Sequence, residues 1–416
     1  MTVRLRLVVA VVGVVSILAG CAPSPPAPPP SYNRPQRSLT PPFPGATELP
    51  PADMTDDGPG SLVNVNPLKG SVTFQTANAT AVQVLYRSTS SSGQPTLVSG
   101  VVAVPAGKPP KGGWPVISFG HSLTGVDMKC APSLAKELGG YASAMVTLLN
   151  RGYVVAMSDY QGLGVKGYDH VALDWVTLGN NMIDVVRAAR RVLPDIGDKW
   201  AAEGSGQGGL AAWAAAERAR DYGAGLNMVG AVALSPFSDM SPLVDVASKG
   251  ALSSMQERLL MVLLQNISAH TPDFDLDAYR SGVAKDQWDV LTDCAPADPA
   301  GAQKAAAQVK GDDLRPRDDA AAGALRDLLS ATALPGNGGP PPAPVLVVYA
   351  TDDTMVPQAG VARTLKSACA KGDPVVVMRL IGETSTTNYQ IVQTTLSWLK
   401  SRFDGERPGN ICVGAS

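Results

Sequence analysis

Short apolar segments that alternate with helical patterns place the strongest limit on how this chain can fold. Six runs have the composition of strands buried in a parallel sheet: residues 115–119, 153–158, 199–203, 228–234, 345–349 and 375–380. Helical patterns separate or follow them, at residues 178–192, 207–220, 361–369 and 388–403. Two β-rich runs come first, 80–87 and 96–104, and the turn sequence Ser-Ser-Gly-Gln-Pro between them predicts an antiparallel pair. The alternation predicts an α/β fold with a mostly parallel, doubly wound sheet.

One long segment interrupts the alternation. More than a hundred residues separate Leu234 from Val345, without a convincing strand. This segment holds helical stretches such as residues 253–266 and ends in a run of glycine and proline. An insertion of this size before a sheet strand predicts a helical cap at about 236–343 that covers the site, and not a second independent domain.

The first residues have the pattern of an export signal. Arg4 and Arg6 precede an apolar run, residues 7–18, that is too short to span a bilayer as a mature helix. The run ends in Leu-Ala-Gly-Cys, which resembles the lipobox of bacterial lipoproteins. The pattern predicts a signal peptide at 1–20, cleavage before Cys21 and a lipid such as palmitate on its thiol. The alternative is an uncleaved or ordinarily cleaved signal.

Proline dominates the segment that follows. Residues 21–60 hold thirteen of the 35 prolines of the chain, a density that excludes regular helices and strands. We expect an extended tether there, whose last part could instead pack on the domain. With a lipid on Cys21, the domain at 61–412 would be anchored to the outer face of the cytoplasmic membrane or held in the cell envelope.

Charge and cysteine usage limit the partners of the chain. A formal net charge of -2 argues against nucleic acid. Four cysteines remain after Cys21, which in an exported chain indicates two disulfides with three possible pairings: Cys130, Cys294, Cys369 and Cys412. None of their spacings is that of a zinc site, so we expect neither a metal nor another cofactor.

The turn at residues 203–209 follows an apolar strand and precedes a helix. Enzymes that cleave acyl esters carry Gly-x-Ser-x-Gly at such a turn, with the nucleophilic serine in the middle. Here Gly204 and Gly208 are the outer glycines, the middle residue is Gly206, and Ser205 lies one position early. Glycine adopts the strained angles of the turn at little cost, so the turn can persist without its nucleophile. A phosphate-binding turn is the weaker alternative, because that motif belongs on the first strand of a fold.

The other members of a serine, acid and histidine triad are also traceable. Asp353 follows the strand at 345–349 and lies three residues before Val-Pro. In a hydrolase, a carboxylate at this place would orient the histidine. A role as a turn residue or helix N-cap explains Asp353 equally well. The histidine belongs on the loop after the last strand, yet no histidine follows His270, and Glu383 stands there instead. A carboxylate cannot perform the acid–base cycle of imidazole near neutral pH.

The three histidines of the chain have explanations other than a catalytic base. His121 and Ser122 lie just after the first central strand, in a loop like those whose backbone N–H groups form half of an oxyanion hole. Gln207, which begins the next helix, would supply the other N–H. His170 is expected to be structural, and His270 lies in the expected cap.

Four motifs together resemble the secretory lipase family of fungi and actinobacteria. They are Gly-x-x-Gln-Gly-Gly at 204–209, Asp-Tyr-Gln-Gly-Leu-Gly at 159–164, Cys-Ala-Pro-Ser at 130–133 and Asp-x-x-Val-Pro at 353–357. The resemblance covers about 57–412, and the lipobox and alanine bias add a likeness to mycobacterial lipoproteins. It implies an α/β-hydrolase core with a helical cap, acting on triacylglycerols or other acyl esters through a Ser/Asp/His triad.

The resemblance also assigns positions. The nucleophile maps onto Gly206, the acid onto Asp353 and the histidine onto the loop of Glu383. The family cysteines imply the pairs Cys130–Cys294 and Cys369–Cys412.

Three hypotheses about function follow. The first is an inactive lipase homologue that keeps a site for an acyl lipid or a protein partner. The second is an active esterase with a rearranged site, such as Ser205 with His170. The third is a scaffold whose pocket has no role.

Overall fold

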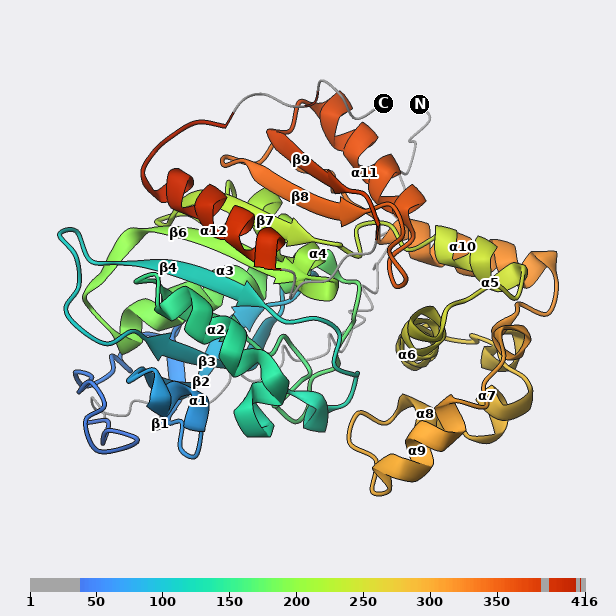
Figure 1. The fold of residues 1–416 in the computed structure, drawn as a ribbon, viewed down its shortest axis with the longest axis horizontal. Coiled ribbons are helices and arrows are strands. Elements are labelled where there is room, and N and C mark those ends of the chain that lie inside the picture. Colours follow the sequence, from blue (N-terminus) through green and yellow to red (C-terminus); the bar gives the residue numbers. More distant parts are fainter. Residues whose placement is uncertain (1–37, 383–388, 409–411, 413–416) are drawn as a thin grey trace, which may run out of the picture. The chain divides into compact units, whose positions relative to one another are not determined.

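A single twisted sheet organises the computed structural model, which describes residues 38–382, 389–408 and 412. Within these residues the sheet has nine strands in the order β1-β2-β3-β5-β4-β6-β7-β8-β9 (Figure 1). The strands are β1 Leu62–Pro67, β2 Thr80–Thr89, β3 Pro95–Val104, β4 Trp114–Gly120, β5 Val154–Ser158, β6 Ile196–Ser205, β7 Asn227–Leu234, β8 Val345–Ala350 and β9 Val375–Leu380.

Strand direction divides the sheet into two parts. β1, β2, β3 and β5 pair antiparallel, and β5, β4, β6, β7, β8 and β9 pair parallel. The parallel strands are nearly continuous apolar runs because both of their faces are covered. The predicted α/β class with a mostly parallel sheet is therefore confirmed, whereas β1, a half-buried edge strand that ends in Pro67, was not predicted.

Helices cover both faces of the sheet. α3 Trp175–Val192, α4 Gln207–Arg218 and α11 Gln358–Lys371 share one apolar core. α1 Val72–Thr76, α2 Tyr141–Leu149 and α12 Tyr389–Phe403 share the other, and Figure 1 shows α2 and α12 in front of the sheet. α3 and α4 approach closely at Gly179, where a Cβ would lie 2.9 Å from the carbonyl carbon of Ala214. This three-layer arrangement leaves the ends of the strands to form sites.

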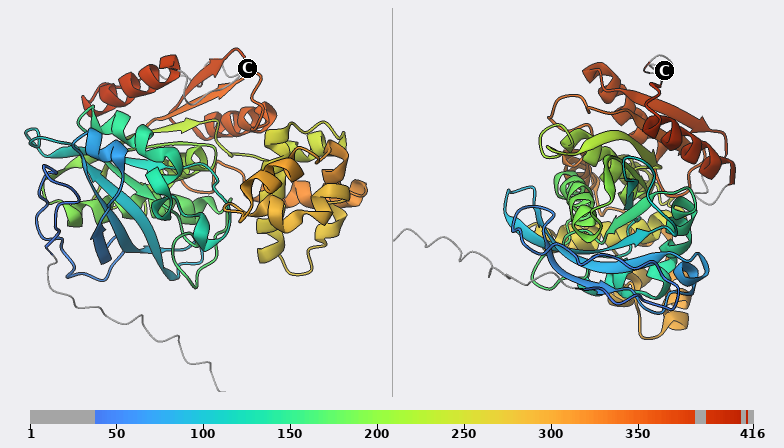
Figure 2. Two further views of the ribbon diagram at one scale, coloured as in Figure 1. Left: turned by 60° about the horizontal axis from the view of Figure 1, so that its bottom comes forward. Right: turned by 90° about the vertical axis from the view of Figure 1, so that its left-hand side faces the viewer.

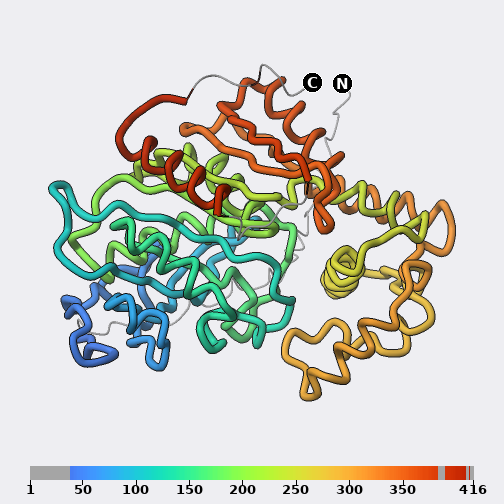
Figure 3. Tube along the Cα trace, in the orientation of Figure 1, coloured from blue at the N-terminus to red at the C-terminus, as the bar shows by residue number. Residues whose placement is uncertain are grey.

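A helical insertion joins β7 to β8. Residues 235–344 form α5 Pro242–Ser248, α6 Ser254–His270, α7 Gly282–Asp286, α8 Trp288–Thr292, α9 Pro299–Ala306 and α10 Asp319–Ala331. The chain path in Figure 3 and the side views in Figure 2 place these helices beyond the carboxyl ends of the parallel strands. Ser253 and Gln256 form a capping box that begins α6, the longest helix of the insertion.

Part of the proline-rich segment lies against the domain. Leu49, Ala52 and Met54 are buried in the core of the α3 face. The backbone N–H of Asp53 donates to the carbonyl of Arg191 at 2.9 Å, and the two side chains form an ion pair at 3.0 Å. Residues 38–60 thus pack on the domain, which was the alternative to an extended tether for this part of the chain. Cys21 and the signal segment lie outside the described residues.

Two disulfides close the fold. Cys130–Cys294 joins the segment after β4 to the loop after α8, and Cys369–Cys412 joins α11 to the C-terminal segment. These are the two pairs that the family resemblance implied. In the part of the chain that the structure describes, no helix is long and apolar enough to cross a membrane.

Candidate functional site

The turn between β6 and α4 has a strained glycine at its apex. Gly206 has φ 59° and ψ −117°, angles that side chains with a Cβ rarely adopt. Its N–H donates to the carbonyl of Leu234 at 3.0 Å, and its own carbonyl accepts from the N–H of Phe237 at 3.1 Å. These bonds tie the apex to the end of β7, so the sharp turn is held by the fold.

The outer glycines are required by close packing. A Cβ on Gly204 would lie 2.3 Å from the carbonyl oxygen of Gly208, and one on Gly208 would lie 2.1 Å from the carbonyl oxygen of Gly120. The start of α4 therefore rests directly on the backbone at the ends of β4 and β6. The geometry of the turn persists with glycine in the middle.

Two side chains occupy the space over the apex. A Cβ built on Gly206 would lie 2.6 Å from Ser122 Oγ and 3.2 Å from two ring carbons of Phe237, which is 2% exposed. A side chain at position 206 would therefore have to displace the Ser122 hydroxyl and press on the Phe237 ring. Sequence reasoning missed Phe237, because nothing in the local pattern after β7 shows that its ring folds back over the turn.

The backbone donors expected for an oxyanion hole are only partly free. The N–H of Ser122 donates to Tyr141 Oη at 3.1 Å. The N–H of Gln207 stands at the first position of α4, where helix geometry leaves it without an intrahelical acceptor. The structure places Ser122 and Gln207 beside the same apex, and Tyr141 covers the N–H of Ser122.

His121 is buried beneath this loop. Its ring lies between Tyr141 and Tyr160, with Nδ1 2.7 Å from the carbonyl oxygen of Ser122 and Nε2 3.2 Å from that of Asp159. Burial lowers the pKa of His121, and the nearby Asp159 carboxylate acts in the opposite direction. With both nitrogens against backbone oxygens, His121 positions the loop.

His170 is also fully engaged. Gln207 Nε2 donates to the carbonyl of Ala172 at 2.8 Å and lies 2.9 Å from His170 Nε2. Because an amide nitrogen can only donate, His170 Nε2 accepts, and its Nδ1–H donates to the carbonyl of Gln161 at 2.9 Å. Burial lowers the pKa of His170 to about 4, so the ring is neutral at pH 7 and both of its nitrogens are used.

The candidate acid lies in a turn before α11. Asp353 Oδ1 accepts from the N–H groups of Met355 at 2.9 Å and Val356 at 2.8 Å. Beside this turn, Gly382 donates to Thr351 Oγ1 at 3.0 Å, so the end of β9 lies next to the end of β8. Glu383, the residue predicted at the histidine position, falls outside the described residues.

Glu203 and Ser205 face away from the apex. Alternation along β6 directs them to the α12 side of the sheet, where they line a cavity of about 540 Å³ between α2 and α12. Glu203 Oε2 is buried and has no hydrogen-bond partner among the described residues, and burial raises the pKa of the Glu203 carboxyl to about 7. Sequence reasoning passed over Glu203, although a carboxylate that ends an apolar strand was a usable signal.

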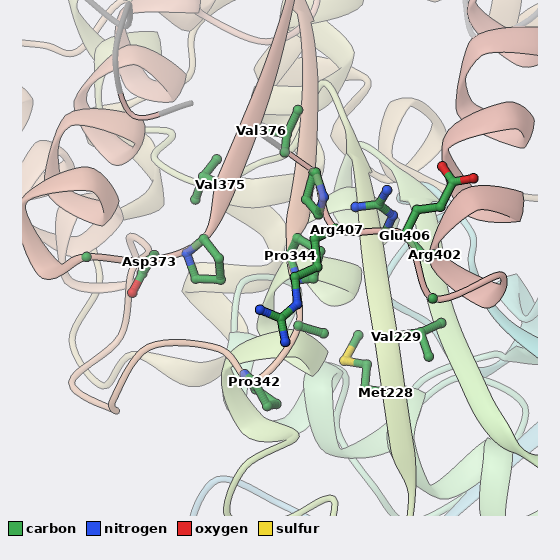
Figure 4. Close-up of a pocket in the computed structure, with 15 residues that line it drawn as sticks. Met228, Val229, Pro342, Pro344, Asp373, Val375, Val376, Arg402, Glu406 and Arg407 are labelled. Atoms are coloured by element: carbon green, nitrogen blue, oxygen red, sulfur yellow. The ribbon is translucent and has the colours of Figure 1, made fainter. Parts of the chain in front are cut away.

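A second cavity lies at the amino ends of three parallel strands. It has about the same volume, 540 Å³, and opens where β7, β8 and β9 begin. Figure 4 shows Met228, Pro344 and Asp373 around it, with Arg402 and Arg407 from the end of the chain. None of the residues predicted from the sequence lines this cavity. Among the described residues, no cluster of histidine, cysteine or acidic side chains is arranged to hold a metal ion.

The sheet order, the turn after β6, the acid turn after β8 and the helical insertion define an α/β-hydrolase of the lipase type. The chain belongs to the secretory lipase family, whose model matches residues 139–410. This confirms the family and fold that the sequence predicted.

Individual relatives agree with this placement. A probable inactive lipase of Mycobacterium tuberculosis is 26% identical over 349 residues, which cover 79% of this chain and 74% of the relative. Candida antarctica lipase A in its closed state superposes with a TM-score of 0.67 at 20% identity, covering 90% of this chain and 89% of the lipase. LipA, a rice cell wall degrading esterase of Xanthomonas oryzae, gives 0.64 at 18% identity, covering 84% and 100% of the two chains. At these identities the two structures establish the shared fold.

Proposed function

We propose that this chain is a secretory-lipase homologue that no longer hydrolyses esters and keeps its scaffold to bind an acyl lipid. The observation that carries the proposal is the apex of the turn after β6, where Gly206 replaces the nucleophile and Ser122 and Phe237 fill the space above it. The mycobacterial relative, itself named a probable inactive lipase, supports the same conclusion. A protein partner in place of the lipid is the second form of this hypothesis.

The proposed location is the cell envelope. Membership of a secretory family fits export, and the lipobox-like sequence before Cys21 supports a lipid anchor on the outer face of the cytoplasmic membrane. An anchored, lipid-binding domain would meet its ligand at the membrane surface. Globomycin, which blocks lipoprotein signal cleavage, should make the precursor accumulate in cells, and a chain with Cys21→Ala should be found unanchored.

The alternative is an active esterase that pairs Ser205 with His170. Contacts in the structure weigh against it, because both ring nitrogens of His170 bond to Gln161 and Gln207, while Ser205 lines the cavity between α2 and α12. A serine nucleophile needs a base within hydrogen-bond reach. The proposed inactivity therefore rests on the positions of existing side chains as well as on Gly206.

Two assays separate these functions. Purified protein is incubated with short-chain p-nitrophenyl esters and with a fluorophosphonate probe that labels activated serines. We expect no hydrolysis that depends on Asp353 and no labelled serine. Hydrolysis abolished by Asp353→Ala, or labelling of any serine, Ser122 and Ser205 included, would overturn the proposal. Mass spectrometry of the purified protein tests the binding role, since a scaffold with an unused pocket would carry no lipid.

Restoring the nucleophile by Gly206→Ser should not restore turnover. The new Cβ meets Ser122 Oγ and the Phe237 ring in a backbone conformation unfavourable to serine, so we expect a loss of about 1–3 kcal/mol of stability. Without an imidazole base, only weak catalysis remains. Urea unfolding and ester assays measure both effects, with Gly206→Ala as the matched control for strain. Robust hydrolysis by Gly206→Ser would reveal an unrecognised base.

A further inference from the structure

The cavity between α2 and α12 has the size of a ligand site. Its volume of about 540 Å³ lies within the range of ~300–1,000 Å³ that small-molecule pockets occupy. Leu148, Leu234 and Leu396 contribute apolar walls from three different elements. The side chains of Glu203 and Ser205 enter the cavity from the α12 side of β6, and the cavity extends to Ser122, beside the apex of Gly206.

One carboxyl group in this apolar space lacks a partner. Within the part of the chain that the structure describes, Glu203 Oε2 is buried and accepts no hydrogen bond, and the Glu203 carboxyl is the only acidic group that lines the cavity. Those residues include no lysine, arginine or histidine; Tyr141 lines the cavity and Tyr153 lies near enough to interact with the carboxyl. Burial is the sole cause that raises the pKa of Glu203. A buried polar group without a partner is costly, so a ligand that donates to it would be favoured.

We propose that this cavity binds a single-chain amphiphile whose head donates hydrogen bonds and carries no negative charge, such as a primary amine or a hydroxyl. The head lies at Glu203, within reach of the hydroxyl groups of Ser205 and Ser122 that also line the space. The alkyl chain lies along the apolar walls of α2 and α12. This inference rests on the proposed lipid-binding function and adds the class of head group.

Charge decides against the most common single-chain lipid. A fatty acid would place a second carboxylate beside Glu203 with no cation among the lining side chains, and two like charges at one site disfavour each other. An ammonium head gains an ion pair in an apolar setting, and a hydroxyl gains an acceptor. The expected order of affinity is therefore amine, then alcohol, then carboxylate.

Isothermal titration of the purified chain at pH 8 with decylamine, decanol and decanoate tests this order. We expect decylamine to bind at least about tenfold more tightly than decanoate, the size of one hydrogen bond to a charged group. Glu203→Gln should weaken decylamine binding about tenfold and remove most of the discrimination. The comparison of head groups on the unmodified chain remains decisive even if that variant folds poorly.

A second variant tests the position of the ligand. Ala144 lines the cavity from an exposed position on α2, so Ala144→Trp should block the space and abolish binding, whereas Ala320→Trp, on an exposed position of α10, should not. Decanoate binding as tight as decylamine, or no effect of Glu203→Gln, would overturn the head-group class. Binding that survives Ala144→Trp would place the ligand elsewhere, such as the cavity of Figure 4. If the chain binds alkyl chains without head-group preference, the inference fails and the lipid-binding function stands.

Discussion

The three histidines of the chain share one role at the level of the residue. The Nδ1 atoms of His121, His170 and His270 each lie 2.7–2.9 Å from a backbone carbonyl oxygen, of Ser122, Gln161 and Asn266 respectively. Each ring therefore stabilises a loop or helix end. In a lipase one imidazole stays free to exchange protons with the nucleophile. His121 and His170 are not free to do so, because their Nε2 atoms also lie against the Asp159 carbonyl and the Gln207 amide.

Glu203 gives a residue-level prediction about pH. Burial raises the pKa of its carboxyl to about 7 in the folded protein, from an ordinary value of 4.5 when the chain is unfolded, so the charged form disfavours folding. The contribution of Glu203 to the free energy of unfolding is fully present below pH 4.5 and is lost as the pH rises through about 7. Glu203→Gln should remove this loss and be more stable than the natural protein by about 1–3 kcal/mol at pH 8, with little difference at pH 4.5.

Urea unfolding at the two pH values measures this effect. The substitution Glu48→Gln, on an exposed glutamate of the segment before β1, is the matched control and should change stability at neither pH. A Glu203→Gln protein that is less stable than the natural one at pH 8 would show that the carboxylate has a partner that stabilises it.

At the level of elements, Asn266 joins the helical insertion to the core. It lies in α6, where its Oδ1 accepts from the N–H of Ala172 at 2.9 Å and its Nδ2 donates to the carbonyl of His170. The same short segment accepts from Gln207 at the start of α4. A chain of hydrogen bonds thus runs from α6 of the insertion to the turn of Gly206.

Removal of this link should loosen the helical insertion. Asn266→Ala leaves the buried N–H of Ala172 and carbonyl of His170 without partners, and we expect a loss of about 1–3 kcal/mol. Urea unfolding and the rate of limited proteolysis within residues 235–344 measure the effect. Arg258→Ala, at an exposed position of the same helix, serves as the control. Equal stability of the two variants would mean that apolar packing alone holds α6.

At the level of the whole molecule, covalent links hold distant segments together. Cys130–Cys294 spans 164 residues and attaches the helical insertion to the loop after β4, where Lys129 and Asp293 also form an ion pair at 2.7 Å. Cys369–Cys412 spans only 43 residues and fastens the end of the chain to α11. The first disulfide constrains the unfolded chain more than the second because it closes a longer loop.

The two disulfides should therefore contribute unequally. Replacing both cysteines of a pair with serine should lower the free energy of unfolding by about 2–4 kcal/mol, and by about 1 kcal/mol more for Cys130–Cys294 than for Cys369–Cys412. Urea unfolding of the two double variants, without reductant, gives the comparison. A larger loss for the Cys369–Cys412 pair would contradict the loop-length argument.

Much of the fold was predictable because local patterns specify it. The parallel strands and the helices α3, α4, α11 and α12 were predicted within a few residues, since both periodicity and flanking turns mark them. The short elements β1, α1 and α2 were missed. They contain five to nine residues each and depend on packing against the sheet, which no local pattern reveals.

The sequence by itself determined the α/β class, the family, the glycine at position 206 and the absence of a histidine after His270, because each is a matter of residue type and order along the chain. Only the tertiary structure decided what surrounds Gly206. Phe237 and Ser122 reach the apex from positions 31 residues after and 84 residues before it, and Tyr141 binds the N–H of Ser122 from another helix. The Glu203 carboxyl, whose Oε2 has no partner among the described residues, likewise faces a cavity with walls from three strands and the helices α2 and α12. Such contacts form when distant segments pack together, and local pattern carries no record of them.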